Sequence, residues 1–181
     1  MSTTDIQKSN VIDFDTVSAN QVEIPATSSE RYITGIYALN IPAPEGTTGD
    51  WHDVFYWRQG IDRPRTILLG GGDEVDTNAV YGDLGVYEGR AQLVAKGLTV
   101  PVGVTEVYVA NHFRAILDLV YRSLRRYGRV LNLRGATTDW LDTPEQQQYV
   151  LDQAARLSDV LDEPQRQALA AWIAGERREA A

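Results

Sequence analysis

The chain has 181 residues, a formal net charge of −8 and no cysteine, and 43% of its residues are hydrophobic. These totals predict one globular domain of ordinary size, and they exclude disulfide bonds and thiolate metal sites. The acidic balance makes nucleic acid an unexpected partner, and it favours a protein or a small molecule. Because no stretch resembles a signal peptide or a membrane span, we expect a cytoplasmic protein.

Residues 1–30 differ in composition from the rest of the chain. They are rich in Ser, Thr and Asn, and they hold five acidic residues against one basic residue, Lys8. This composition predicts a flexible acidic tail, or alternatively a segment that orders on a partner. A single domain is expected over residues 31–175, followed by a frayed, charged end at 176–181.

Several short segments rich in β-branched and aromatic residues predict strands. A proline- and glycine-containing loop, Asn40–Asp50, separates the first two of them. The predicted strands are Arg31–Leu39, Trp51–Arg58, Thr66–Leu69, Val100–Val104 and Arg129–Leu133.

The longest helical pattern runs from Thr105 to Tyr127. Its apolar residues recur every three or four positions and share one face, and Gly128 is placed to cap the end. Asp118 and Arg122 lie four residues apart on the other side, where we expect a surface ion pair. The pattern predicts a long central helix that organises the core.

Three further helices are predicted. One covers Thr77–Gly97, and the other two begin at Thr143 and at Asp162, each an N-cap residue followed closely by proline. Because a short connection joins the last two, they are expected to form a C-terminal helical hairpin. Strands and helices alternate without a regular βαβ order, so the predicted class is α+β, with a small mixed sheet in a single domain.

The densest candidate site is the segment Gly49–Asp53. Asp50, His52 and Asp53 could bind a metal or act in acid–base chemistry, with His112 as a further ligand. A catalytic metal site usually needs three protein ligands, and His112 lies about 60 residues away along the chain. The alternative is that the surrounding aromatic residues belong to the core or to an interface, and that His52 hydrogen-bonds the preceding loop.

Two other stretches are candidates for anion binding. Gly70–Gly72 lacks the Lys and Ser/Thr of a P-loop and is followed by acidic residues, so a simple turn is the alternative. A basic patch interleaved with tyrosines is suited to an anion or RNA, or it is a solvated helix face. The arginines of this patch are Arg122, Arg125, Arg126, Arg129 and Arg134.

Three segments carry a family resemblance: YITGIYALNIPAPEGTTGDWH (32–52), NAVYGDLGVYEGRAQLVAKGL (78–98) and ATTDWLDTPEQQQYVLDQAARL (136–157). Across about Arg31 to Leu157 the chain resembles small bacterial proteins encoded beside nucleotidyltransferase-like toxins and taken to be their antitoxins. The resemblance implies a protein that neutralises a cognate toxin by direct contact. It carries over no catalytic residue, cofactor or metal.

We therefore predict an antitoxin-like binding protein rather than an enzyme. Aromatic side chains are the usual anchors of a tight interface, and the acidic tail would assist association. The alternatives are a metal-assisted hydrolase or nuclease built on Asp50, His52 and Asp53, and a nucleotide or small-ligand sensor built on Gly70–Gly72. The residues predicted to contact the partner are Trp51, His52, Phe55 and Trp57.

Overall fold

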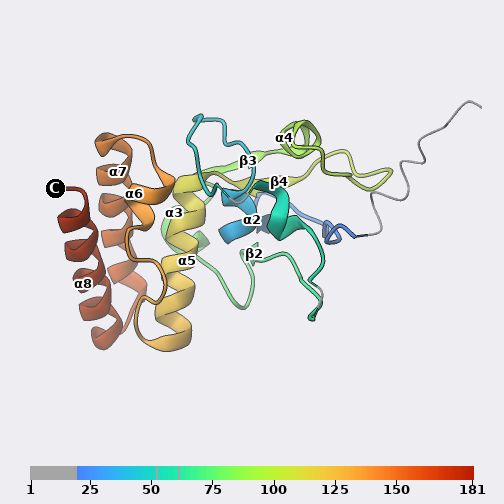
Figure 1. The fold of residues 1–181 in the computed structure, drawn as a ribbon. Helices are drawn as coiled ribbons and strands as arrows, with labels where there is room; N and C mark the ends of the chain where they lie inside the picture. The colour runs from blue at the N-terminus through green and yellow to red at the C-terminus, as the bar shows by residue number, and fades with distance from the viewer. Residues whose placement is uncertain (1–19, 52, 61) are drawn as a thin grey trace, which may run out of the picture.

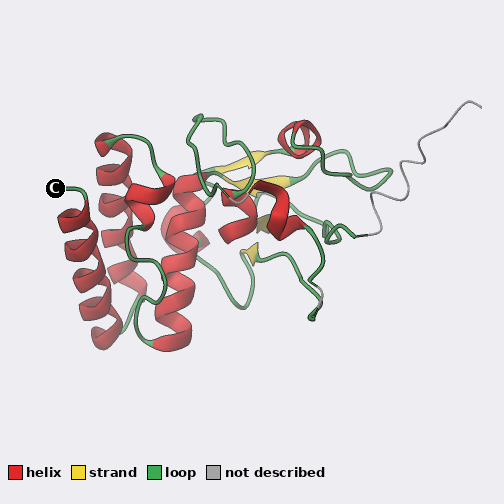
Figure 2. Ribbon diagram, viewed as in Figure 1, coloured by secondary structure: helices red, strands yellow, loops and turns green. Residues whose placement is uncertain are grey.

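A four-stranded mixed sheet lies beside the helices in the computed structural model, which describes residues 20–51, 53–60 and 62–181 (Figure 1). The short strands are β1 (Tyr32–Ile33), β2 (Leu69–Gly70), β3 (Val86–Glu88) and β4 (Tyr108–Ala110) (Figure 2). Their order is β2-β1-β4-β3, with β1 parallel to β4 and both outer strands antiparallel to their neighbours. The predicted α+β domain with a small mixed sheet is confirmed.

Helices stack against one side of this sheet. The long helix α5 (His112–Tyr127) contacts α7 (Pro144–Ala155) and α8 (Glu163–Glu179), which contact each other as the predicted hairpin (Figure 1). None of the helices in the described ranges is long and apolar enough to cross a bilayer. The shorter elements are α2 (Gly35–Leu39), η1 (Asp53–Trp57), α3 (Asn78–Tyr81), α4 (Arg90–Ala95), α6 (Ala136–Trp140) and η2 (Arg156–Val160).

Helix α5 is the predicted long central helix, but it begins at His112 and not at Thr105. Residues Tyr108–Ala110 form β4 instead, and the Asn111 side chain then caps α5 by accepting a backbone N–H of the first turn at 2.9 Å. At the other end Gly128 has a left-handed φ of 67° and caps the helix as predicted. The periodic pattern of apolar residues therefore extends through β4, and for this reason it predicted too early a start for the helix.

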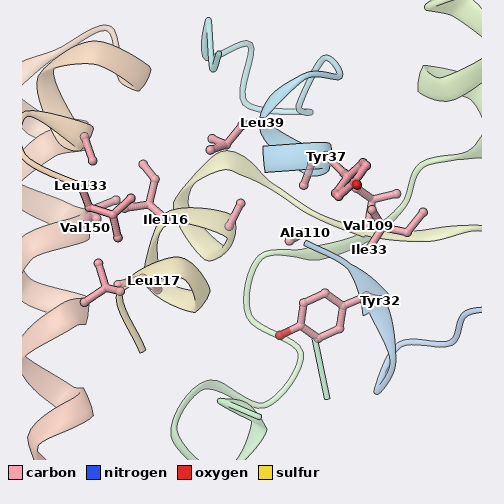
Figure 3. Close-up of a cluster of buried hydrophobic side chains, with 14 of the residues drawn as sticks. Tyr32, Ile33, Tyr37, Leu39, Val109, Ala110, Ile116, Leu117, Leu133 and Val150 are labelled. Carbon is pink, nitrogen blue, oxygen red and sulfur yellow. The ribbon is translucent and has the colours of Figure 1, made fainter. Parts of the chain in front are cut away.

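The hydrophobic core lies where α5 meets the sheet and the C-terminal helices (Figure 3). A fully buried Val, Leu or Ile contributes about 1.5–3 kcal/mol relative to an exposed one, so this contact supplies much of the stabilising free energy. Side chains from two strands, two helices and the segment before α6 meet in it, among them Ile33, Val109, Ile116, Leu117, Leu133 and Val150.

A buried ion pair on α5 is tied to two other elements. Arg114 Nε lies 3.3 Å from Asp118 Oδ1, and the side chains of both residues are at most 1% exposed. Thr77 donates to Asp118 Oδ1 at 2.6 Å, and Thr34 and Tyr32 donate to Oδ2 at 2.7 and 3.0 Å. Burial raises the pKa of Asp118, whereas Arg114 and the three hydroxyl donors lower it. The carboxylate thus links β1, α5 and the start of α3.

The other donors of Arg114 are also used. Its Nη1 donates to the carbonyls of Gly82 and Leu84 at 3.1 and 2.8 Å, and its Nη2 donates to Asn78 at 2.9 Å. Its guanidinium carbon lies 5.1 Å from the ring centre of Tyr81. A buried guanidinium is tolerated only when it is paired and hydrogen-bonded in this way.

The predicted surface pair between Asp118 and Arg122 is wrong. Asp118 faces the buried side of α5, while Arg122 pairs with Glu74 through two hydrogen bonds of 3.0 and 2.8 Å. The spacing of four residues is met by Arg114 instead, one turn earlier. The prediction failed because the helical pattern assigns charged side chains such as Asp118 to the solvent-exposed face.

Most of the predicted strands are also wrong. Strand β1 ends at Ile33 and Gly35, at a φ of 64°, starts α2, so Arg31–Leu39 is not one strand. Trp51–Arg58 contains the 3-10 turn η1, and Val100–Val104 and Arg129–Leu133 form no strand. Thr66–Leu69 coincides only at its end with β2. Strands of two or three residues are too short to show an alternating pattern.

The predicted helix over Thr77–Gly97 is divided into α3, β3 and α4. Gly82 and Gly85, with φ angles of 56° and 75°, lie between α3 and β3 and turn the chain there. Gly97 closes α4 at a φ of 83°, as expected for a glycine after a helix.

Both predicted terminal segments are partly structured. Residues 1–19 of the predicted tail lie outside the described residues, but Val22 and Ile24 are buried, and the Val22 N–H donates to the Trp57 carbonyl at 2.8 Å. At the other end α8 continues past Gly175 to Glu179. Glu176 is buried there, and it accepts the Gly135 N–H at 2.7 Å at the start of α6.

The first prediction concerns the Asp118 carboxylate. Asp118→Asn removes the charge opposite a buried Arg114, and such a loss costs about 3–5 kcal/mol of unfolding free energy. Urea unfolding followed by circular dichroism measures the change. The matched control is Asp152→Asn on the exposed side of α7, which is expected to change stability by less than about 0.5 kcal/mol. Equal effects of the two substitutions would contradict the role given to Asp118.

Candidate functional site

An exposed aromatic surface lies at residues 51–65. Trp51 is 79% exposed and Phe55 is 55% exposed, which is unusual for side chains of this size. Arg65 stacks over the Phe55 ring at 4.8 Å, and Tyr56 meets the edge of that ring at 5.6 Å. We call Trp51, Phe55, Tyr56 and Arg65 the aromatic surface.

Arg65 also holds the backbone of this segment. Its Nη1 donates to the carbonyls of Phe55 and Arg58 at 3.0 and 3.1 Å, and its own N–H donates to the Gln59 side chain at 3.0 Å. The end of η1 is thereby fixed to the chain ten positions away. Arg65 could not be predicted as part of this surface, because neither periodicity nor a motif connects it with Phe55 in the sequence.

Trp57, which was predicted to contact the partner, is a core residue. It is fully buried, and its ring meets the edge of Tyr37 with 5.6 Å between ring centres. Alternation along a strand would place Phe55 and Trp57 on the same side, but η1 is a 3-10 turn with about three residues per turn. Residues two apart therefore point in different directions, and Trp57 is not available to a partner.

The Asp50, His52 and Asp53 cluster is described only in part. His52 and the side chain of Asp53 lie outside what the structure describes. Asp50 is 7% exposed, and one of its carboxylate oxygens accepts from the Asn40 amide at 3.1 Å. Among the described residues, no group of three or more His, Asp or Glu side chains is placed to hold a metal ion.

His112 is engaged at both ring nitrogens. Its Nε2 lies 2.8 Å from the Ile41 carbonyl, and its Nδ1 makes a short hydrogen bond with the Thr47 hydroxyl. A carbonyl can only accept, so Nε2 carries the proton and Nδ1 accepts from Thr47. Burial lowers the pKa of His112, and the Ile41 carbonyl and two nearby carboxylates oppose that shift. The neutral ring therefore connects α5 to the loop that contains Ile41 and Thr47.

The structure brings three arginines of the predicted basic patch close to the glycine turn. Two adjoining hollows of about 470 and 380 Å³ share Asp73, Glu74 and Arg122 as lining residues. Gly72 and Arg31 also line the first hollow, and Arg125 and Arg126 line the second. We call this pair of hollows the arginine groove.

The remaining arginines of the predicted patch lie in a different place. Arg129 and Arg134 line a hollow of about 560 Å³ beside α8. Arg134 pairs there with Glu179 at 2.6 Å. The patch predicted from the sequence therefore divides between two surfaces.

The glycines of the turn have a structural reason of their own. A Cβ on Gly70 would lie 2.4 Å from the Tyr32 ring, and a Cβ on Gly71 would lie 1.7 Å from the Glu30 carbonyl oxygen. Gly71 also has a φ of 73°, which favours glycine. These contacts account for two of the three glycines without a bound phosphate.

No protein-family model, no curated protein and no solved structure gives a significant match to this chain.

The second prediction separates crowding from backbone conformation in this turn. Gly71→Ala combines a left-handed φ with a clash against the Glu30 carbonyl, whereas Gly97→Ala has a similar φ and nothing within 4 Å of the added Cβ. We expect Gly71→Ala to lower the unfolding free energy by about 1–3 kcal/mol more than Gly97→Ala. Urea titration measures the unfolding free energy of both variants. An equal loss in the two would contradict a contribution from the close approach of Gly71 to the Glu30 carbonyl.

The third prediction follows from the neutral His112. Its pKa is lower in the folded chain than the ordinary value of 6.5, so the unfolded chain takes up the proton first as the pH falls. The His112 contribution to stability is therefore complete above about pH 6.5 and declines below it. Between about pH 7 and pH 5.5 the wild type should lose more unfolding free energy than His112→Gln, whose amide still offers a donor to Ile41. Identical pH profiles would contradict this reading.

Proposed function

We propose that the chain is a protein-binding protein whose contact region is the aromatic surface. The observation that carries the proposal is the exposure of Trp51 and Phe55, at 79% and 55%, together with the hydrogen bonds by which Arg65 holds the Phe55 and Arg58 carbonyls. Tryptophan, tyrosine and arginine are the residue types that most often dominate binding energy at protein interfaces. Apolar side chains exposed together mark interaction sites more often than singly exposed ones do.

The Arg65 hydrogen bonds support a tight contact for a second reason. A partner that binds a mobile loop must also order it, and that ordering reduces the net binding free energy. Here Arg65 and the buried Trp57 already fix the C-terminal part of η1, from Phe55 onward. The aromatic side chains of η1 would therefore contact the partner from a backbone that is already ordered before binding.

Local charge narrows the chemistry of the partner. Arg58 and Arg63 are exposed near the aromatic surface, with Asp62 between them in the chain. Together with Arg65 they give residues 51–65 a formal charge of +1, because Asp53 and Asp62 oppose the three arginines, in a chain of net charge −8. Complementary potential favours a partner whose contact patch is acidic or neutral and contains a pocket for an aromatic ring.

The resemblance of the three sequence segments suggests what the partner would be. We propose that it is a cognate toxin, nucleotidyltransferase-like as the resemblance implies, and that the chain acts as its antitoxin. The alternative of a metal-assisted hydrolase receives less support, because both nitrogens of His112 are engaged and the Asp50 side chain is buried.

The fourth prediction tests this function with the product of the neighbouring gene. The two proteins are expected to co-purify, and co-expression should relieve any growth defect that the neighbour causes. Trp51→Ala or Phe55→Ala should weaken binding by about 2 kcal/mol, roughly 30-fold in Kd, when measured by calorimetry. Truncation removes the side chain that would enter the partner, while the fold stays intact because both residues are exposed.

Tyr127→Ala is the matched control, since Tyr127 is 53% exposed on the far end of α5 and lies outside the aromatic surface. Its affinity should equal that of the wild type. Separate elution of the two proteins at micromolar concentration would contradict the proposal. Equal affinities of all the variants would show that the interface lies outside the aromatic surface.

A further inference from the structure

The arginine groove combines two kinds of lining. The first hollow is lined by apolar residues together with polar and charged ones, and the second is lined only by charged side chains, three of which are arginines. The two share a border at Asp73, Glu74 and Arg122, so one ligand can occupy both. The apolar residues of the first hollow are Ile36, Ile67, Leu68, Leu69 and Leu119, with Tyr37 beside them.

The acidic residues in the groove do not cancel its positive charge. Arg122 binds Glu74 through both Nε and Nη2, so that pair is internally neutral. Arg31, Arg125 and Arg126 then face Asp73 alone, which leaves an excess of positive charge. The acidic residues that follow the glycine turn would by themselves repel phosphate. The pairing of Glu74 with Arg122 reduces this repulsion.

Two of the arginines are available to a ligand. Among the described residues, the guanidinium groups of Arg31 and Arg125 form no ion pair with a carboxylate, and both residues are exposed. Arg126 is also exposed and lies over the Tyr127 ring at 5.4 Å. A guanidinium presents several donors in one plane and matches the oxygens of a phosphate in a bidentate manner.

We propose that the arginine groove binds an organic anion of nucleotide size. The flat ring system lies against the apolar side chains of Ile67 and Leu119, and the phosphate groups lie against Arg125 and Arg126. Hollows of about 470 and 380 Å³ fall within the usual range for small-ligand sites. The lining residues of this site include none of the four residues of the aromatic surface, and the proposal stands or falls independently of the proposed partner.

The test uses the full chain with ATP, adenosine and pyrophosphate as probes, by calorimetry without a divalent metal. ATP is expected to bind more tightly than either fragment, because only ATP reaches both the apolar lining residues and the arginines. The double variant R125Q/R126Q should weaken ATP binding by about tenfold or more. The matched control is R177Q/R178Q, which removes the same charge from the last turn of α8.

Four results would overturn the proposal. They are no ATP binding at about 1 mM, unchanged ATP affinity in R125Q/R126Q, pyrophosphate binding as tightly as ATP, and binding of a short single-stranded RNA alone. Arg125 and Arg126 are exposed, so the double variant is expected to fold, and a thermal melt checks this. Should it unfold, the single variants R125Q and R126Q carry the same expectation of weaker ATP binding.

Discussion

The buried contact between Arg114 and Asp118 constrains much of this structure. A charge removed from water is stable only where its partner and all its hydrogen bonds are in place, so the groups around it have little freedom. Thr34 and Tyr32 reach the carboxylate from β1, and Thr77 reaches it from the start of α3. Strand β1 and helices α3 and α5 are therefore fixed relative to one another by one polar cluster inside an apolar core.

The two surfaces argued to bind ligands depend on this frame in different ways. Tyr32 belongs to the polar cluster, and its ring lies so close to Gly70 that no side chain fits there, which sets the position of the turn lining the arginine groove. The C-terminal half of α5 supplies the arginines opposite. The aromatic surface is held from inside, because Trp57 packs against Tyr37 in the core while Phe55 faces outward.

How far the sequence predicts this arrangement depends on how local each signal is. The capping box at Thr143 and the left-handed cap at Gly128 are made by neighbours in the chain, and both were predicted correctly. The strands are two or three residues long and exist through pairing with distant segments, so no local pattern defines them. The exposure of Phe55 and the burial of Trp57 follow from a 3-10 turn that alternation cannot show, and the arginine groove joins residues about 50 positions apart, such as Glu74 and Arg122.

The central claim is that a fixed frame presents the aromatic surface to a protein partner. Hydrogen exchange on the chain, alone and mixed with the product of the neighbouring gene, tests it most directly. The account predicts slower exchange on binding for the amides of residues 53–58 and 62–65, and unchanged exchange around the polar cluster at residues 78–81 and 114–118. Slowing confined to other segments, with residues 53–58 and 62–65 unaffected, would contradict it.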